Sequence, residues 1–138
     1  MSHLELRDLC KRYDGSVAVD GLNLSVDRGE FVALLGPSGC GKTTTLRMIA
    51  GLEQPTSGQI LIGGKDVTRL SPAERDVSMV FQSYALFPHL SVMDNVCYGL
   101  RSTGMPRARA RELARARLDL VGLTGLDDRL PSALSGGQ

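Results

Sequence analysis

The start of the chain alternates apolar and polar residues, and this pattern predicts two half-exposed antiparallel strands. Leu4 to Leu9 alternates, Leu22 to Val26 does the same, and Asp27-Arg28-Gly29 supplies a turn after the second run. Glu30 to Leu35 is almost wholly apolar over the length of a strand, as expected of a parallel strand covered on both faces. An antiparallel region is therefore predicted to lead into a buried strand.

A helix is predicted after this apolar run. Lys42 to Ala50 places Leu46, Ile49 and Ala50 on one face at helical spacing. Gly51 follows where a helix commonly ends in the left-handed conformation. A strand, a glycine-rich loop and a helix are thus expected in that order.

The sequence after Gly51 contains signals that predict two further strands and three helices. A capping box with proline at the first helical position starts a short helix, a second serine cap starts a longer one, and a glycine and a proline break the chain before the last. In chain order we expect a strand at Gln59–Ile62, a short helix after Ser71, a strand at Val77–Phe81, a helix from Ser91 to about Leu100, and a helix from about Ala108 to Val121. Strands followed by consecutive helices indicate an α/β fold.

The glycine-rich loop before the first helix carries the clearest chemical signal. Residues 36–43, Gly-Pro-Ser-Gly-Cys-Gly-Lys-Thr, match the pattern G-x-x-x-x-G-K-[ST]. In this pattern backbone N–H groups converge on phosphate oxygens, the lysine reaches the terminal phosphates and the threonine hydroxyl binds magnesium. A glycine-rich turn without a ligand would leave Lys42 and Thr43 without a purpose. The candidate phosphate-binding residues are Gly36, Ser38, Gly39, Cys40, Gly41, Lys42, Thr43 and Thr44, and Thr43 is also a candidate magnesium ligand.

Composition and charge narrow the class of protein. Hydrophobic residues make up 42% and charged residues 22% of the chain, which is typical of one globular domain. No apolar run approaches the length of about 20 residues that crosses a bilayer, and residues 1–5 resemble no export signal. Three widely spaced cysteines predict free thiols. We therefore expect a cytoplasmic protein.

Residues 101–117 are locally basic, with six arginines and one acid, Glu112. An acidic partner such as nucleic acid is one reading of this segment. However, Ala110, Leu113, Ala114, Leu118 and Val121 form an apolar stripe at helical spacing, and no aromatic residues interleave the arginines. The net charge of the whole chain is only +1. We therefore predict a solvated helix face and no nucleic-acid partner.

Three further motifs make the chain resemble the ATP-binding subunits of ATP-binding cassette (ABC) importers. Lys11-Arg12-Tyr13 is similar to the aromatic A-loop, Val80 to Leu90 is similar to the Q-loop, and Leu134 to Gln138 reads LSGGQ, the family signature. The resemblance implies that Tyr13 stacks on adenine and that Gln82 touches magnesium and senses the membrane partner. It also implies that Ser135, Gly136, Gly137 and Gln138 act in trans on the phosphate loop of a second copy.

The resemblance implies a P-loop NTPase core with an N-terminal antiparallel β region over about residues 1–82, and a Q-loop and helical subdomain over about 83–138. It places the Walker B strand, the carboxylates that hold magnesium and polarise water, and a phosphate-contacting histidine after Gln138. We therefore expect an N-terminal part of a longer ATPase, truncated before the Walker B strand. These 138 residues alone should not hydrolyse ATP, and unpaired backbone should be exposed beside the phosphate-loop strand.

The resemblance further implies ATP and Mg²⁺ as cofactors, and ATP hydrolysis that drives solute uptake. The implied partners are transmembrane permease subunits, a second ATPase subunit in a homodimer and, indirectly, a solute-binding protein; the location would be the inner face of the cell membrane. The sequence around Gln82 is similar to that in the ATPases of sugar, polyamine, iron and phosphonate importers. Two alternatives stay open: a nucleotide-binding module without turnover, and a soluble ABC protein acting on nucleic acid or ribosomes.

Overall fold

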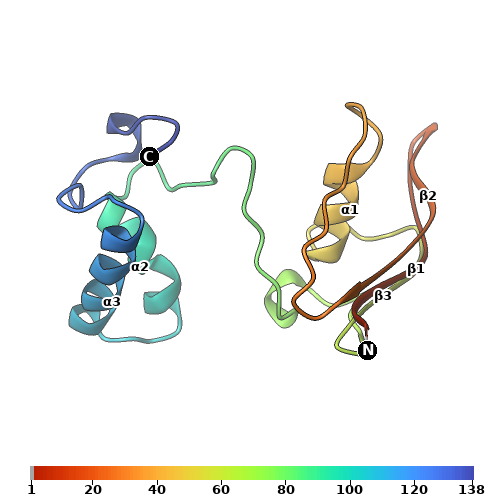
Figure 1. The fold of residues 1–138 in the computed structure, drawn as a ribbon, viewed down its shortest axis with the longest axis horizontal. Coiled ribbons are helices and arrows are strands. Elements are labelled where there is room, and N and C mark those ends of the chain that lie inside the picture. Colours follow the sequence, from red (N-terminus) through yellow and green to blue (C-terminus); the bar gives the residue numbers. More distant parts are fainter. Residues whose placement is uncertain (1) are drawn as a thin grey trace. The chain divides into compact units, whose positions relative to one another are not determined.

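The alternation at the start of the chain builds a long β-hairpin of β1 (Ser2–Tyr13) and β2 (Ser16–Asp27). β1 also pairs with β3 (Ser57–Ile62), and β3 with β4 (Lys65–Asp66), so the antiparallel sheet has the order β2-β1-β3-β4. The computed structural model describes residues 2–138 (Figure 1). They form two compact units that divide between Met79 and Val80, close to the predicted boundary at residue 82.

The first unit packs the sheet against α1 (Lys42–Ile49) around a core of Leu6, Leu9, Val19, Met48, Ile60 and Val67. Leu6 and Leu9 both face this core because a register shift between them turns the strand. At the shift Asp8 has a positive φ of 46°, and its N–H donates to Asn23 Oδ1 over 2.9 Å. An amide side chain thus supports the irregular backbone of β1.

The predicted helix at Lys42–Ala50 is confirmed, and so is its end. Gly51 has a φ of 77°, and the N–H of Leu52 donates to the carbonyl oxygen of Arg47 over 2.9 Å, as in a Schellman motif. The predicted face is confirmed at Ala50, which is buried, and at Ile49, which packs against the core, but it is wrong at Leu46, which is 47% exposed. Thr45 and Met48 are the other buried residues of this helix. In a helix of two turns, apolar spacing locates the buried face only approximately because neighbours lie roughly 100° apart.

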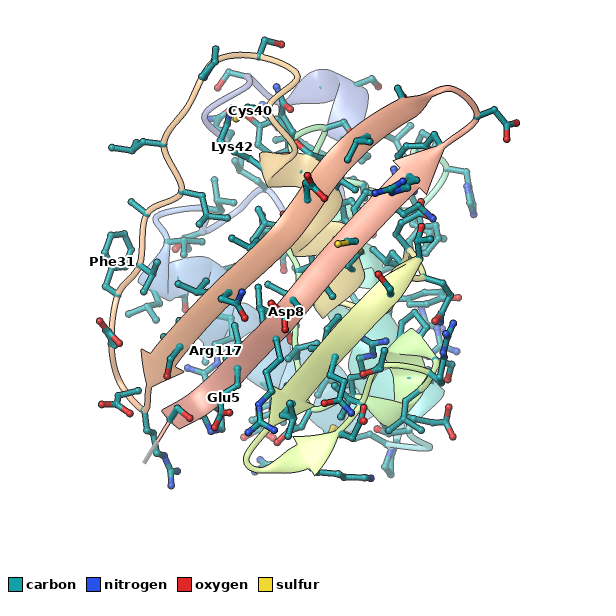
Figure 2. All side chains as sticks on the ribbon, turned by 90° about the vertical axis from the view of Figure 1, so that its right-hand side faces the viewer. Glu5, Asp8, Phe31, Cys40, Lys42 and Arg117 are labelled. Atoms are coloured by element: carbon teal, nitrogen blue, oxygen red, sulfur yellow. The ribbon has the colours of Figure 1, made fainter. Side chains whose placement is uncertain are left out.

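Two predicted strands are wrong. Glu30–Leu35 is extended but lies in no ladder, and Phe31 is 93% exposed (Figure 2). Val77–Phe81 also forms no strand, and Val80 is 89% exposed. An apolar run becomes a strand only where another strand accepts its hydrogen bonds, and no segment among residues 2–138 pairs with either run. The expected exposure of backbone beside the phosphate loop is thereby observed.

The predicted short helix is the 3₁₀ helix η1 (Pro72–Glu74), which begins at a complete capping box between Ser71 and Glu74. The second unit contains α2 (Val92–Ser102), α3 (Arg107–Leu120) and the 3₁₀ helix η2 (Pro131–Ala133). Ser91 caps α2 as predicted, because its Oγ accepts from the N–H of Asp94 over 3.1 Å. None of the helices in residues 2–138 has the length and apolarity needed to cross a membrane.

α2 and α3 pack around Val92, Met93, Cys97, Ala110, Ala114 and Leu118. The predicted apolar stripe of α3 is confirmed at three of these positions, whereas Val121 lies past the helix and is 65% exposed. Five of the arginines in 101–117 are exposed and Arg111 is half-buried. The basic segment is thus a solvated helix face as predicted. The three cysteines are free.

Candidate nucleotide-binding site

The phosphate loop closes on its own lysine. Lys42 is the first residue of α1, and its Nζ donates to the carbonyl oxygens of Gly36, 2.6 Å away, and Pro37, 2.7 Å away. The same nitrogen lies 3.3 Å from Cys40 Sγ. The ammonium group is therefore held inside the loop, at the amino end of the helix (Figure 2).

The amino end of α1 offers backbone donors to an anion. The first turn of any α-helix leaves N–H groups without intrahelical acceptors, and no side chain caps them here. The positive end of the helix dipole points the same way. Thr43, in this first turn, is exposed. Backbone donors, an ammonium and a hydroxyl thus all belong to the first turn of α1, a set of groups that suits phosphate oxygens.

Gly41 brings the loop against the hairpin. It is the residue before α1, with a φ of 91°, and a Cβ there would collide with the carbonyl oxygen of Ala18 on β2. Elsewhere the loop stands away from β2, because a cavity of about 370 Å³ lies between them. Lys42 and Thr45 contribute polar groups to its wall, and β2 contributes Asp20 beside apolar side chains.

Tyr13 is the last residue of β1 and is 45% exposed. The hairpin turn that follows it lies at the same end of the first unit as the phosphate loop (Figures 1 and 2). Lys11 Nζ lies 4.8 Å from the centroid of the Tyr13 ring and pairs with Glu53 Oε1 at 2.6 Å. A hydrogen bond from Lys11 is the main cause that holds the pKa of Glu53 below its ordinary value of 4.5. Sequence reasoning missed this Lys11–Glu53 pair, because nothing in the local pattern indicates a contact across more than 40 residues.

Gln82 lies in the second unit and is exposed. The chain after it is held by Asn95 of α2, whose Oδ1 accepts from the N–H of Phe87 over 2.9 Å. Asn95 Nδ2 donates to the carbonyl oxygens of Phe87 and Leu90, at 3.1 and 3.0 Å. Tyr84, between Gln82 and this brace, has a positive φ of 63°. Asn95 carries no sequence signal of this role and was missed.

Residues 135–138 of the signature form a turn whose two ends are joined by two hydrogen bonds. The N–H of Gln138 donates to the carbonyl oxygen of Ser135 over 3.0 Å, and the N–H of Ser135 donates to Gln138 Oε1 over 3.0 Å. All four residues are exposed. Together with Ser83 and Tyr84 they line a cavity of about 510 Å³. The second unit thus brings the signature beside the segment that follows Gln82, whereas the phosphate loop and Tyr13 belong to the first.

Comparison with known proteins gives a consistent result. Residues 19–138 match the family model described as ABC transporter. The chain is 64% identical over 132 residues to the Fe(3+) ions import ATP-binding protein FbpC 1 of Rhizobium meliloti, covering 96% of this chain and 37% of that protein. It is 52% identical over 135 residues to Fe(3+) ions import ATP-binding protein FbpC of Escherichia coli, covering 98% and 39%. The chain therefore spans less than two fifths of the length of these relatives.

Solved structures show the same relationship. The ATP-binding cassette MJ0796, in a dimeric post-hydrolysis state bound to ADP and Pi, matches with a TM-score of 0.88 and 31% identity over 98% of this chain and 64% of that one. A second dimeric structure of MJ0796, a bacterial ABC transporter cassette, matches with a TM-score of 0.87 and 32% identity. The matched family model covers most of the chain, including the phosphate loop, Gln82 and the signature turn. The chain belongs to the ABC transporter family.

Proposed function

We propose that these residues form the nucleotide-binding part of an importer ATPase, which couples binding and hydrolysis of ATP to solute uptake. The observation that carries the proposal is the position of Lys42, whose ammonium lies inside a loop at the uncapped amino end of α1. A positive group beside the free N–H donors of a helix amino end recognises the β- and γ-phosphates of a nucleoside triphosphate. Family membership supports the same conclusion.

The other predicted residues take matching roles in this proposal. Tyr13 stacks on the adenine, and the loop residues Gly36 to Thr44 bind the phosphates. The exposed hydroxyl of Thr43 and the exposed amide of Gln82 are oxygen donors, which suit Mg²⁺ bound jointly by protein and phosphate. Mg²⁺ would neutralise charge on the phosphates during transfer.

A second copy of the ATPase completes the site in our proposal. Ser135, Gly136 and Gly137 lie in an exposed turn, where they can reach a phosphate bound by another chain. The dimeric state of the ABC cassette MJ0796 supports this arrangement. Each phosphate loop would then face the signature turn of its partner.

The relatives support a proposal for the membrane partners and the solute. FbpC proteins are named for the import of Fe(3+) ions, so we propose a ferric iron importer whose permease subunits hold this ATPase at the inner face of the membrane. A solute-binding protein would deliver the ion on the other side.

Nucleotide binding tests the proposal directly. Calorimetric titration of ATP and Mg²⁺ into the protein that carries these residues should show binding, and Lys42→Ala should abolish it. Lys65→Ala removes the same charge from an exposed position on β4 and should leave the affinity unchanged. Unchanged affinity in a folded Lys42→Ala variant would refute the assignment.

Hydrolysis distinguishes the importer ATPase from a module that only binds. We propose that a polypeptide of residues 1–138 releases no phosphate above background, whereas a chain extended through the length of the FbpC relatives turns over ATP. Turnover by the short polypeptide that Lys42→Ala eliminates would show that it holds a catalytic carboxylate of its own. Binding without turnover by the extended chain would favour the binding module.

A further inference from the structure

Lys11 is fixed behind the aromatic ring of Tyr13. Its Nζ pairs with Glu53 Oε1 at 2.6 Å and donates to the carbonyl oxygen of Gln54 at 2.8 Å. Only 13% of the Lys11 side chain and 23% of that of Glu53 are exposed. A lysine with two partners and little contact with water has lost most of its rotamer freedom, so its position 4.8 Å from the ring centroid is well defined.

The contact orients the ring of Tyr13. A cation close to an aromatic ring is attracted by the negative charge on the face of the ring. A nucleobase cannot stack on the face that Lys11 covers. The opposite face is the one available, and 45% of Tyr13 is exposed.

The anchor of Lys11 follows directly after the helix that starts at the phosphate loop. Glu53 follows the end of α1, and its N–H donates to the carbonyl oxygen of Arg47 in the last turn over 3.2 Å. Thr56 ties the following residues to β1, since its N–H donates to the carbonyl oxygen of Cys10 over 2.9 Å and its Oγ1 accepts from the N–H of Arg12 over 3.0 Å. The strand that ends in Tyr13 is thereby connected to α1, whose other end carries Lys42.

We propose that Lys11 is a positioning residue for the nucleobase: anchored by Glu53 and Gln54 at the end of α1, it covers one face of Tyr13 and presents the other at a fixed distance from the phosphate loop. This inference rests on the proposed function, since it concerns the base of the nucleotide whose phosphates Lys42 binds. It assigns to a lysine outside the phosphate loop a part in recognition of the base alone.

Two probes separate base recognition from phosphate recognition. ATP carries both parts, whereas inorganic tripolyphosphate carries only the phosphates. In calorimetric titrations Lys11→Met should weaken ATP about fivefold, in keeping with the loss of a partly desolvated cation–π contact, and leave tripolyphosphate affinity unchanged. Lys11→Arg keeps a cation able to pair with Glu53 and should retain ATP affinity. Lys65→Met is the matched control at an exposed lysine and should change neither.

A double variant tests whether Lys11 acts through the ring. In a Tyr13→Ala background, Lys11→Met should weaken ATP no further, because the group that it positions is gone. An equal loss of ATP and tripolyphosphate affinity in Lys11→Met, or an undiminished loss in the Tyr13→Ala background, would overturn the inference. If the unsubstituted protein bound tripolyphosphate but not ATP, the inference would fail while phosphate binding stood. If it bound neither, the proposed function itself would fail.

Discussion

The guanidinium of Arg75 donates from Nη1 to the carbonyl oxygen of Met48, 2.6 Å away, in the last turn of α1. It also donates to the carbonyl oxygens of Ile49, Thr68 and Leu70, at 2.8, 3.1 and 3.1 Å. Arg75 is only 5% exposed, and burial lowers the pKa of its guanidinium. No carboxylate among the described residues pairs with it. The cation is stabilised by carbonyl oxygens and by the negative end of the helix dipole.

Arg75→Met should destabilise the first unit by about 2–4 kcal/mol, because it removes four hydrogen bonds to carbonyl oxygens in and beside the core. Urea unfolding measures the change. Arg69→Met is the control, since Arg69 is an exposed arginine in the same segment. Equal stability of the two variants would show that water replaces the guanidinium at these carbonyls.

Gly41→Ala should prevent the phosphate loop from reaching its observed position. The substitution forces a side chain into a φ of 91° and against the carbonyl oxygen of Ala18. Gly29→Ala is the control, because Gly29 lies outside the phosphate loop and has a similar φ of 81° with open space around the added carbon. Backbone strain alone costs about 1–2 kcal/mol, so both variants should lose that much stability.

Only Gly41→Ala should also lose ATP affinity markedly, because only there must the loop move away from β2. Thermal unfolding and calorimetric titration of the two variants measure strain and displacement separately. Equal ATP affinities in the two variants would mean that the close approach of the loop to the hairpin is dispensable.

Local pattern predicted the helices of this chain well, because their signals lie within a few residues. Three of these signals act over a single turn and are found as expected: the Ser91 cap, the glycine after α1, and the capping box between Ser71 and Glu74. The candidate phosphate loop is predicted in the same way, since its lysine and glycines all lie within residues 36–43. The structure holds Lys42 inside this loop.

Contacts between distant segments could not be predicted in this way. Glu30–Leu35 reads as a strand, yet whether it becomes one depends on a partner strand that periodicity does not reveal. The anchoring of Lys11 by Glu53 and the buried position of Arg75 depend on how the sheet and α1 pack. Residues that support the site from a distance in sequence were therefore the ones missed.

The Lys11–Glu53 pair should make stability depend on pH in a defined direction. The folded-state pKa of Glu53 is depressed below 4.5, so the carboxylate contributes stability above its unfolded pKa, and this contribution is lost as the pH falls through the folded pKa. Unfolding temperatures measured from pH 7 to about pH 3 should therefore drop less steeply for Glu53→Gln than for the unsubstituted protein. Glu112→Gln, at an exposed carboxylate that pairs with Arg109, is the control. Parallel pH profiles for all three proteins would contradict a role for this pair.

Asn95 should determine how firmly the segment after Gln82 is held. Its side chain makes four hydrogen bonds, accepting from the N–H of Phe87 and donating to the carbonyl oxygens of Phe87, Leu90 and Ser91. Asn95→Ala removes all four, whereas Asn95→Asp keeps the acceptor for Phe87 and places a negative charge against the carbonyl oxygens.

Both Asn95 variants should destabilise the second unit by about 1–3 kcal/mol. They should differ in the hydrogen bond from the N–H of Phe87, which only Asn95→Asp retains. Amide hydrogen exchange at Phe87 should accelerate strongly in Asn95→Ala and less in Asn95→Asp, which retains that single bond. Because Lys42 and Tyr13 lie in the other unit, ATP affinity measured without Mg²⁺ should stay unchanged in both variants. ATPase activity that depends on the proposed permease subunits should fall, since Gln82 is the residue proposed to sense them. Slow exchange at Phe87 in Asn95→Ala would show that the segment is held by contacts other than this amide.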